Sequence, residues 1–297
     1  MHPSYPRLFA LGLGMALTAT GFAQTAAPAA ASGSATGGRA NRPPPAPPVI
    51  PALQSWDRPA EGKPLFTEDF ESGAISDKIW SVIVNPPATA TVQSDLVAHG
   101  KYALKITYPA GSTRDYAFIA MTVPDALKNH FYGRAYMYIS GVPDPHSVFM
   151  SAGTTGFPTR ANWLEIGGYT GHFQPSLQIT NPTADIPRGE VPAFQGTLPI
   201  GRWFCLEFEF IDQPDRIAIW VDGKLDVNIP FTYNKITNPD VKKDSGLIGA
   251  FSEFALGYRT FAQGALIPKD INIYYDDIAI GDKPIGQLTP VSQPAGK

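Results

Sequence analysis

Aromatic, acidic and imidazole side chains gather in one short stretch of the chain, "NWLEIGGYTGHFQPSLQI", residues 162 to 179. The stretch reads as two short strands around a glycine-rich turn. Aromatic rings can stack on sugar rings, and carboxylates and imidazoles can transfer protons. We therefore predict that it forms the floor of a sugar-binding cleft, with these side chains in it: Trp163, Glu165, Tyr169, His172, Gln174 and Gln178.

A second row of polar side chains comes from "YGRAYMYIS", residues 132 to 140. In a strand, alternate side chains point to opposite faces, so Tyr132, Arg134, Tyr136 and Tyr138 share one face. The other face carries Ala135, Met137 and Ile139 and is expected to be core. We predict that the tyrosine–arginine row lines the same concave sheet as Glu165. The alternative is an amphipathic outer strand whose tyrosines cover a neighbouring loop.

Two kinds of polysaccharide cleavage are open to these residues. A lyase that acts on uronic acid sugars needs a group that neutralises the sugar carboxylate, a base and an acid. Arg134 would be the neutralising group, and the base and acid would come from Tyr136, Tyr169, His146 or His172. A glycoside hydrolase needs two carboxylates, which Glu165 would supply together with Glu207 or Glu209.

A binding module without chemistry explains the aromatic residues equally well, so catalysis stays open. Tyr258 and Arg259, in "FALGYRTFAQG" (254 to 264), complete the predicted binding residues. Glu207 and Glu209 have an alternative position on the convex outer sheet, because the local sequence does not say to which sheet their strand belongs.

Composition narrows the classes of partner. The chain is 43% hydrophobic and 16% charged with a net charge of −3, which is typical of a globular body. A net charge this close to zero gives no sign of the positively charged surface that binds nucleic acid, or of the cluster of Lys and Arg that binds anionic lipid. Cys205 is the single cysteine, so no intramolecular disulfide can form. We expect a polysaccharide partner, no nucleic acid, no membrane insertion and a monomer.

The ends of the chain differ from its middle. Arg7 precedes the apolar run "LFALGLGMALTATGFA", which predicts a cleaved signal peptide over residues 1–23 and a secreted or periplasmic protein. Residues 24–63 are rich in Ala and Pro and are expected to be a disordered linker. Residues 64–286 should form the folded domain, and 287–297 a tail.

Within residues 64–286, apolar and polar residues alternate in short runs bounded by Gly, Pro and Asn. These runs include "YALKITY", "YAFIAMTV", "WFCLEFEFI", "RIAIWVDG" and "INIYYDDIAIG". No stretch of comparable length in this part of the sequence shows the apolar period of an amphipathic helix. About ten short strands of this kind predict an all-β jelly-roll β-sandwich of two antiparallel sheets.

Several of these motifs occur in an order that resembles the Cip-like core domain, a secreted concanavalin-like jelly roll similar to the glucuronan and alginate lyases. They are "FTEDFESG", "VAHGKYALKI", "GRAYMYI", "LEIGG", "GRWFCLEFEF", "IAIWVDG" and "IYYDDIAIG", and they span about residues 66 to 286. The resemblance implies a carbohydrate-active protein with a lyase-like cleft. At the positions where the fungal family member has His, Arg and Gln, this chain has Trp163, Glu165 and Tyr169.

The resemblance also implies a structural calcium ion where the first and last strands meet. Glu71 and Asp276 match its acidic ligands, and backbone carbonyls around His99 and Gly100 would add to them. Calcium binds six to eight oxygen ligands and can join loops from distant parts of a chain.

Overall fold

A computed structural model of the chain describes residues 62–112, 116–141, 146–154, 156, 162–178, 189–190, 196–213, 215–230, 248–260 and 269–288. The predicted signal peptide, almost all of the predicted linker and residues 289–297 lie outside this part of the chain. No helix among the described residues is long and apolar enough to span a bilayer.

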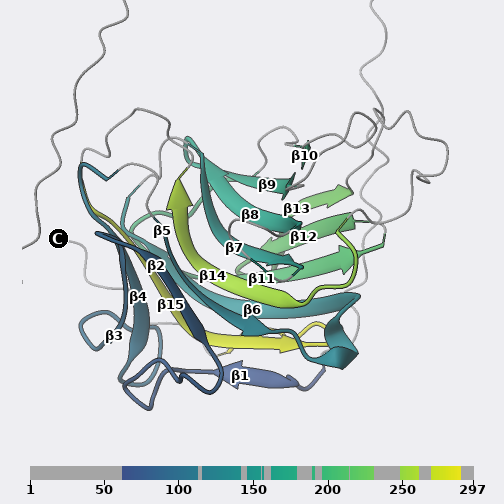
Figure 1. Ribbon diagram of the computed structural model, residues 1–297, viewed down its shortest axis with the longest axis horizontal. Coiled ribbons are helices and arrows are strands. Elements are labelled where there is room, and N and C mark those ends of the chain that lie inside the picture. Colours follow the sequence, from purple (N-terminus) through teal and green to yellow (C-terminus); the bar gives the residue numbers. More distant parts are fainter. Residues whose placement is uncertain are drawn as a thin grey trace, which may run out of the picture. The chain divides into compact units, whose positions relative to one another are not determined.

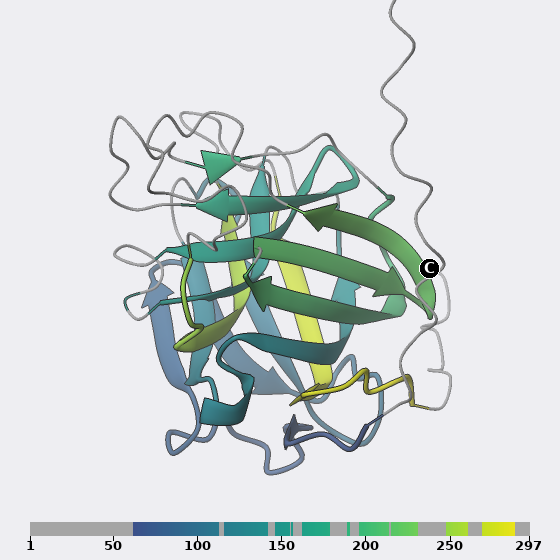
Figure 2. The ribbon, with the colours of Figure 1, turned by 90° about the vertical axis from the view of Figure 1, so that its right-hand side faces the viewer.

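The strands form two antiparallel sheets, A and B, as the alternating pattern predicts (Figure 1). Sheet A runs in the order β13 (Lys224–Pro230), β12 (Asp215–Val221), β11 (Trp203–Asp212), β6 (His130–Ile139), β15 (Ile271–Gly281), β4 (Ala103–Tyr108) and β3 (Thr89–Gln93), and β1 (Phe66–Glu68) pairs with β15. Sheet B runs in the order β10 (Gly189–Glu190), β9 (His172–Gln178), β8 (Trp163–Tyr169), β7 (Ser147–Gly153), β14 (Glu253–Thr260), β5 (Tyr116–Thr122) and β2 (Ser81–Asn85). The described part of the chain adds one 3₁₀ turn, η1 (Asp125–Leu127). Figure 2 shows the green strands β11, β12 and β13 side by side at the end of sheet A.

The core lies between the sheets and takes every second side chain along the regular stretches of the strands. From β6 it takes Phe131, Ala135, Met137 and Ile139, and from β8 it takes Leu164 and Ile166. The faces predicted for these strands are therefore confirmed. In β11 the alternation of "WFCLEFEFI" likewise points Phe204, Leu206, Phe208 and Phe210 inward.

This packing separates the two rows that were predicted to share a cleft. β6 belongs to sheet A and β8 to sheet B, and their core-facing side chains meet in one cluster. Side chains of the opposite parity must then point away from each other, on the two outer faces of the sandwich. The prediction that Arg134 and Glu165 project into one groove is wrong.

The β8–β9 hairpin matches the prediction of two strands around a tight turn. Thr170 and Gly171 form its two-residue turn with φ values of 47° and 82°. Positive φ at both central residues is the geometry that matches the twist of paired strands. The turn fixes the register, in which Glu165 lies opposite Ser176 and Tyr169 opposite His172.

Sheet B contains two neighbouring bulges, in β7 between Val148 and Met150 and in β14 between Leu256 and Arg259. A bulge interrupts the ladder of backbone hydrogen bonds and bends the strand. The hydroxyl of Tyr275, from β15 of sheet A, lies 2.6 Å from the Gly257 carbonyl oxygen and 2.9 Å from that of Phe149. Tyr275 is fully buried, so one side chain crosses the core and joins the two sheets at the bulges.

Candidate functional site

The strand register aligns five outward-facing residues across sheet B, which we call the Glu165 row. It runs from Ser176 in β9 through Glu165, Ser151 and Ala255 to Ala120 in β5, each residue directly opposite the next. All five side chains are buried. Glu165 is thus the one charged member of a row of small residues.

Glu165 is fully buried but accepts three polar contacts. The Arg259 guanidinium donates to Oε1 at 2.7 Å, the Trp163 indole N–H donates to the same oxygen, and the Ser176 hydroxyl donates to Oε2 at 2.9 Å. Burial raises the pKa of Glu165 above its ordinary value, and the Arg259 charge and the hydrogen bonds oppose that rise. Of the three partners, Arg259 carries the charge that can compensate a negative charge on Glu165.

Trp163 positions this pair and is not an open stacking surface. Its side chain is only 6% exposed. The guanidinium carbon of Arg259 lies 5.5 Å from the centre of the Trp163 ring, within the range of a cation–π contact. Arg259 thus contacts both the indole and the carboxylate.

His146 lies just before β7, with the parity of the outer face, and Thr260 Oγ1 donates to its backbone carbonyl. Burial, followed by the positive charge of Arg259, lowers the pKa of His146 to about 4. Its imidazole is therefore neutral at pH 7, the state in which it can accept a proton.

The structure brings together most residues predicted from the opening stretch. Tyr169 in β8 and Gln174 and Gln178 in β9 have the parity of Glu165, and so does His172, whose ring nitrogen is 2.8 Å from the Gly196 carbonyl oxygen. Together with Trp163, His146 and Arg259, they lie on the outer face of sheet B.

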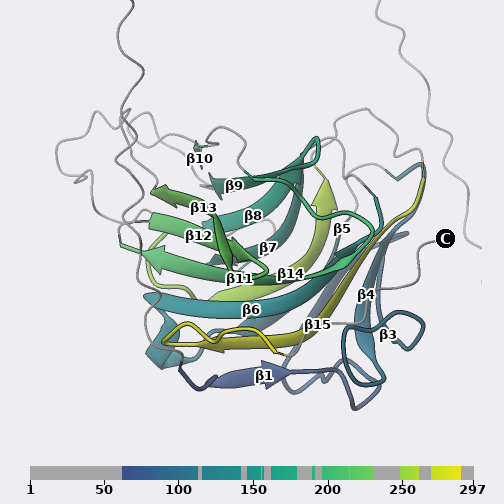
Figure 3. The ribbon, with the colours of Figure 1, turned by 180° about the vertical axis from the view of Figure 1, so that it is seen from behind.

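The predicted tyrosine–arginine row of β6 lies on sheet A, where two of its side chains bind the segment that follows β15. Arg134 Nη1 donates to the Gly286 carbonyl at 3.0 Å, and the Leu288 N–H donates to the Tyr136 hydroxyl at 3.0 Å. The segment after β15, drawn in yellow, passes over β15 and β6 in the view from behind (Figure 3). We call residues 282–288 the C-terminal strap. Tyr132, Arg134, Tyr136 and Tyr138 thus do not join Glu165, and the alternative reading of β6, an outer strand that carries a neighbouring segment, describes Arg134 and Tyr136.

The hydrolase pairing of Glu165 with Glu207 or Glu209 is also wrong, because both glutamates lie on the outer face of sheet A. Glu207 is opposite Arg134 in the β11–β6 register. Glu209 contacts the His130 ring at 2.9 Å and Arg216 at 3.1 Å. Its neighbours, and His130 first among them, lower the pKa of Glu209 against the effect of burial.

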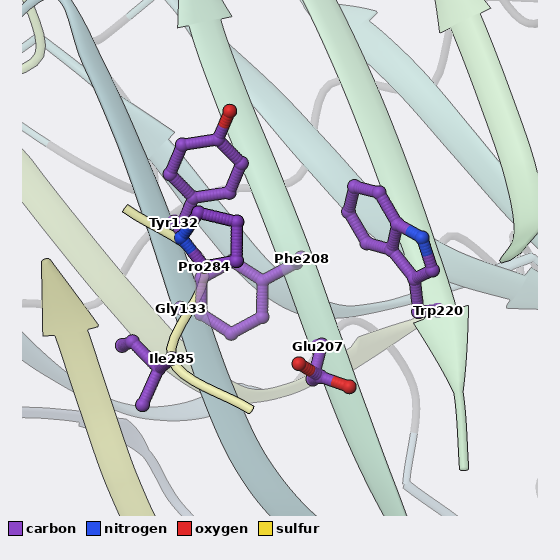
Figure 4. A pocket seen from close by; sticks show the side chains of 7 residues that line it. All are labelled: Tyr132, Gly133, Glu207, Phe208, Trp220, Pro284 and Ile285. Carbon is purple, nitrogen blue, oxygen red and sulfur yellow. The ribbon is translucent and has the colours of Figure 1, made fainter. Parts of the chain in front are cut away.

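A small cavity on sheet A is bounded by Tyr132, Glu207, Trp220 and the strap residues Pro284 and Ile285 (Figure 4). Its volume is about 10 Å³. That is roughly the space for one water molecule, and too little for a sugar ring.

Tyr258 was predicted to bind substrate but is a core residue. It is fully buried, with its ring centre 5.1 Å from that of Tyr108 and 6.2 Å from that of Phe149. Arg259, the next residue, faces outward. Neighbours along a strand alternate, so only one of the two could reach the outer face.

Glu71 and Asp276, the predicted calcium ligands, converge on one loop. Glu71 Oε1 accepts the N–H groups of Lys101 and Tyr102, at 2.8 and 2.9 Å. Asp276 Oδ2 accepts those of Ala98 and His99, at 2.9 and 3.2 Å. Burial, and then the negative charge of Asp277, raise the pKa of Asp276 to about 7.

These contacts show two carboxylates that accept hydrogen bonds from N–H groups of the same loop, and they do not by themselves indicate a cation between them. An ionised carboxylate has about four lone-pair sites, so these N–H bonds leave each group some capacity. Among the described residues, no three His, Cys, Asp or Glu side chains form a metal-binding group. Further calcium ligands would have to be backbone carbonyls or water.

Sequence reasoning did not single out Ser151 and Ser176. Ser176 could have been predicted from the sequence, because it lies between Gln174 and Gln178 and shares their face of the strand. Ser151 was not, because the β7 bulge changes the alternation along that strand. The bulge leaves Phe149 and Met150 both in the core cluster.

No family model matches the sequence, and no curated protein matches it either. Solved structures do resemble it. One is described as cellulose induced protein Cip1, with 19% identity and a TM-score of 0.54 over 75% of this chain and 100% of that one. Another is an endo-β-1,4-glucuronan lyase from the fungus Trichoderma reesei, with 16% identity and a TM-score of 0.53 over 76% of this chain and 100% of that one. The described body therefore has the Cip-like fold, an all-β jelly roll of two antiparallel sheets.

Proposed function

We propose that the chain binds a polysaccharide on the outer face of sheet B, around the Glu165 row. The observation that carries this proposal is the buried Glu165–Arg259 pair on an outer sheet face, held by Trp163 and Ser176. Removing two charges from water is costly, and such pairs are a recognised mark of functional sites. The names of the two structural neighbours, which concern cellulose and glucuronan, support the same class of ligand.

Affinity electrophoresis tests this proposal. We would compare gels that contain a neutral β-glucan, a galactomannan, polygalacturonate or alginate. The wild-type chain should be retarded by at least one of them, and Tyr169→Ala should reduce the retardation, because this half-buried ring lies on the face of Glu165. Tyr138→Ala is the matched control, since Tyr138 is a half-buried tyrosine on sheet A. Retardation by no polysaccharide, or an equal loss in both variants, would contradict the proposal.

Cleavage is a second candidate, favoured by one observation. His146 is a neutral base at pH 7 and lies in the electrostatic range of a cation, Arg259. A neutral imidazole is one of the groups that abstraction of a proton beside a sugar carboxylate requires, and the group that neutralises that carboxylate would have to come from outside the Glu165–Arg259 pair. The test is the ultraviolet absorbance of an unsaturated product from alginate or polygalacturonate, which His146→Gln should abolish. Reducing ends without that absorbance would indicate hydrolysis instead.

We also propose that calcium bridges Glu71 and Asp276. An ion that binds only the folded chain stabilises it, so EGTA should lower the melting temperature and added calcium should restore it. Glu71→Gln should remove that response. If EGTA leaves the wild-type melting curve in place, the two carboxylates act only as acceptors for the loop N–H groups.

Export to the periplasm or the medium remains a prediction from the sequence. Sequencing the amino terminus of the protein recovered from its native compartment would test it, because cleavage after Ala23 would leave Gln24 first.

A further inference from the structure

Two buried polar atoms beside Glu165 have no hydrogen-bond partner among the residues that the structure describes. They are Ser151 Oγ, in a residue 2% exposed, and Gln174 Oε1, in a residue 5% exposed. Buried polar atoms in native proteins nearly always have a partner, and one without it calls for a water or a ligand. Each of these atoms is therefore a position where a water or a ligand atom is expected.

The register places these atoms on two sides of the carboxylate. Ser151 lies directly opposite Glu165 in the β7–β8 pair. Gln174 lies in β9, opposite Gly167 and two residues from Ser176, which bonds to Glu165. Beyond Ser151 the row continues with two alanines, Ala255 and Ala120, whose short side chains leave the serine hydroxyl the last polar group in that direction.

The chemistry of the two atoms restricts what can bind. The amide oxygen of Gln174 only accepts hydrogen bonds, so its partner must carry an O–H or N–H group. The Ser151 hydroxyl can donate or accept. A sugar hydroxyl satisfies both atoms. The ionised carboxylate of a uronate has no proton to donate to Gln174, and a uronate could satisfy this oxygen only through its ring hydroxyls.

The charges around the row favour the same ligand. The positive charge of Arg259 is compensated by Glu165 at 2.7 Å. His146, which lies in the electrostatic range of Arg259, has a pKa of about 4 and is uncharged at neutral pH. A uronate entering here would meet an ion pair that is already complete, together with an amide oxygen that repels it.

We propose that Ser151 and Gln174 form a hydroxyl-binding subsite for an uncharged sugar. This inference rests on the proposed function, and it selects neutral glycans over uronates as the ligands of that site.

Titration calorimetry with neutral hexasaccharides of glucose, mannose and xylose, and with hexagalacturonate, tests it. At least one neutral hexasaccharide should bind more tightly than hexagalacturonate. Ser151→Ala and Gln174→Met should each weaken that binding about five- to tenfold, the value of one neutral hydrogen bond. Their melting temperatures should stay the same or rise, because each change removes a buried polar atom that has no partner in the free protein.

Ser112→Ala is the matched control. Its hydroxyl is also buried, 5% exposed and without a partner among the described residues, but it lies outside the Glu165 row. Its affinity should equal that of the wild type.

Results that contradict the subsite can be told apart from results that contradict the proposed function. Preferential binding of hexagalacturonate, or unchanged affinity in both variants, would overturn the subsite and leave polysaccharide binding in place. A melting temperature lowered by several degrees in both variants would also overturn it, because the two atoms would then have structural partners. If no oligosaccharide or polysaccharide binds, the proposed function itself fails.

Discussion

At the scale of single residues, the Glu165–Arg259 pair is the feature with the largest energetic consequence. Glu165 is fully buried and the Arg259 side chain is 11% exposed. A pair of this kind contributes little compared with an apolar pair of the same size, but the loss of one partner leaves an uncompensated buried charge. The two residues are therefore expected to tolerate change together better than singly.

Arg259→Met should destabilise the chain by about 3–5 kcal/mol at neutral pH, the usual cost of breaking a buried ion pair. The pKa of Glu165 is raised above 4.5 in the folded chain, so folding favours the protonated side chain. The contribution of Glu165 to stability is therefore complete below about pH 4.5 and is lost as the pH rises through the folded-state pKa. Loss of the cation raises that pKa further. The difference between variant and wild type should therefore grow as the pH rises above about 4.5 in urea unfolding.

Arg202→Met is the control for this prediction. Arg202 pairs with Asp222 at 2.8 Å, but the two side chains are 44% and 42% exposed. An exposed pair of this kind contributes less than about 1 kcal/mol. A loss of stability at Arg259 no larger than that at Arg202, or one independent of pH, would contradict the role of Arg259.

At the scale of elements, the C-terminal strap explains the second polar row. The Arg134 side chain donates to two backbone carbonyls, those of Gly286 and Asp277, and the Tyr136 hydroxyl bonds to Leu288. The row therefore fastens a chain segment, and a tyrosine–arginine pattern alone does not distinguish that role from sugar binding.

Tyr136→Phe should lower stability by about 1–2 kcal/mol, because it removes the hydroxyl that bonds to Leu288. Polysaccharide binding should be unchanged, since Tyr136 is on sheet A. Thermal melts and affinity gels measure the two effects. Impaired binding at full stability would return this row to the functional site.

Gly133 in β6 is a place where the core allows no side chain. A Cβ atom there would lie 2.1 Å from the Phe208 ring, whereas one at Gly141 would meet its nearest atom, in Ile271, at 3.5 Å. Overpacking a core usually costs about 1–3 kcal/mol, so Gly133→Ala should destabilise the chain by at least that amount. Gly141→Ala should lie within about 0.5 kcal/mol of the wild type by denaturant unfolding. Equal stability of the two variants would show that Phe208 can move.

The strand patterns were largely predictable at this scale, and the sheets were not. Alternation in "YGRAYMYI" and "WFCLEFEFI" gave the correct inward and outward faces, because it depends only on strand geometry. Sheet membership depends on pairing between distant segments, as in β6 with β15, and local sequence does not encode it. For that reason Arg134 and Glu165 had correct local faces and a wrong common site.

At the scale of the whole molecule, the sandwich fold follows from the alternation of about ten short strands. The resemblance to the Cip-like domain agrees with the observed fold, although identity to the solved neighbours is below 20%. A likeness in fold does not assign roles to single residues. In this chain Trp163 and Glu165 both contact Arg259, which comes from a strand far along the chain.

A chain that begins at Ser55 should fold as stably as the full chain. All the strands that the structure describes lie between Phe66 and Gly281, and the most N-terminal described hydrogen bond joins Gly62 to Pro284. The melting temperature and the affinity for polysaccharide should both match those of the full chain. A large fall in either would assign a role to the first 54 residues.

Tyr275 has a consequence for anyone who wishes to transplant the Glu165 row into another scaffold. Its hydroxyl serves the backbone at the two adjacent bulges, and these bulges set the positions of Ser151 and Arg259. A graft that copied only the residues of sheet B would leave those carbonyls without their donor. The smallest set of residues that would preserve the geometry of the row therefore includes Tyr275 from the opposite sheet.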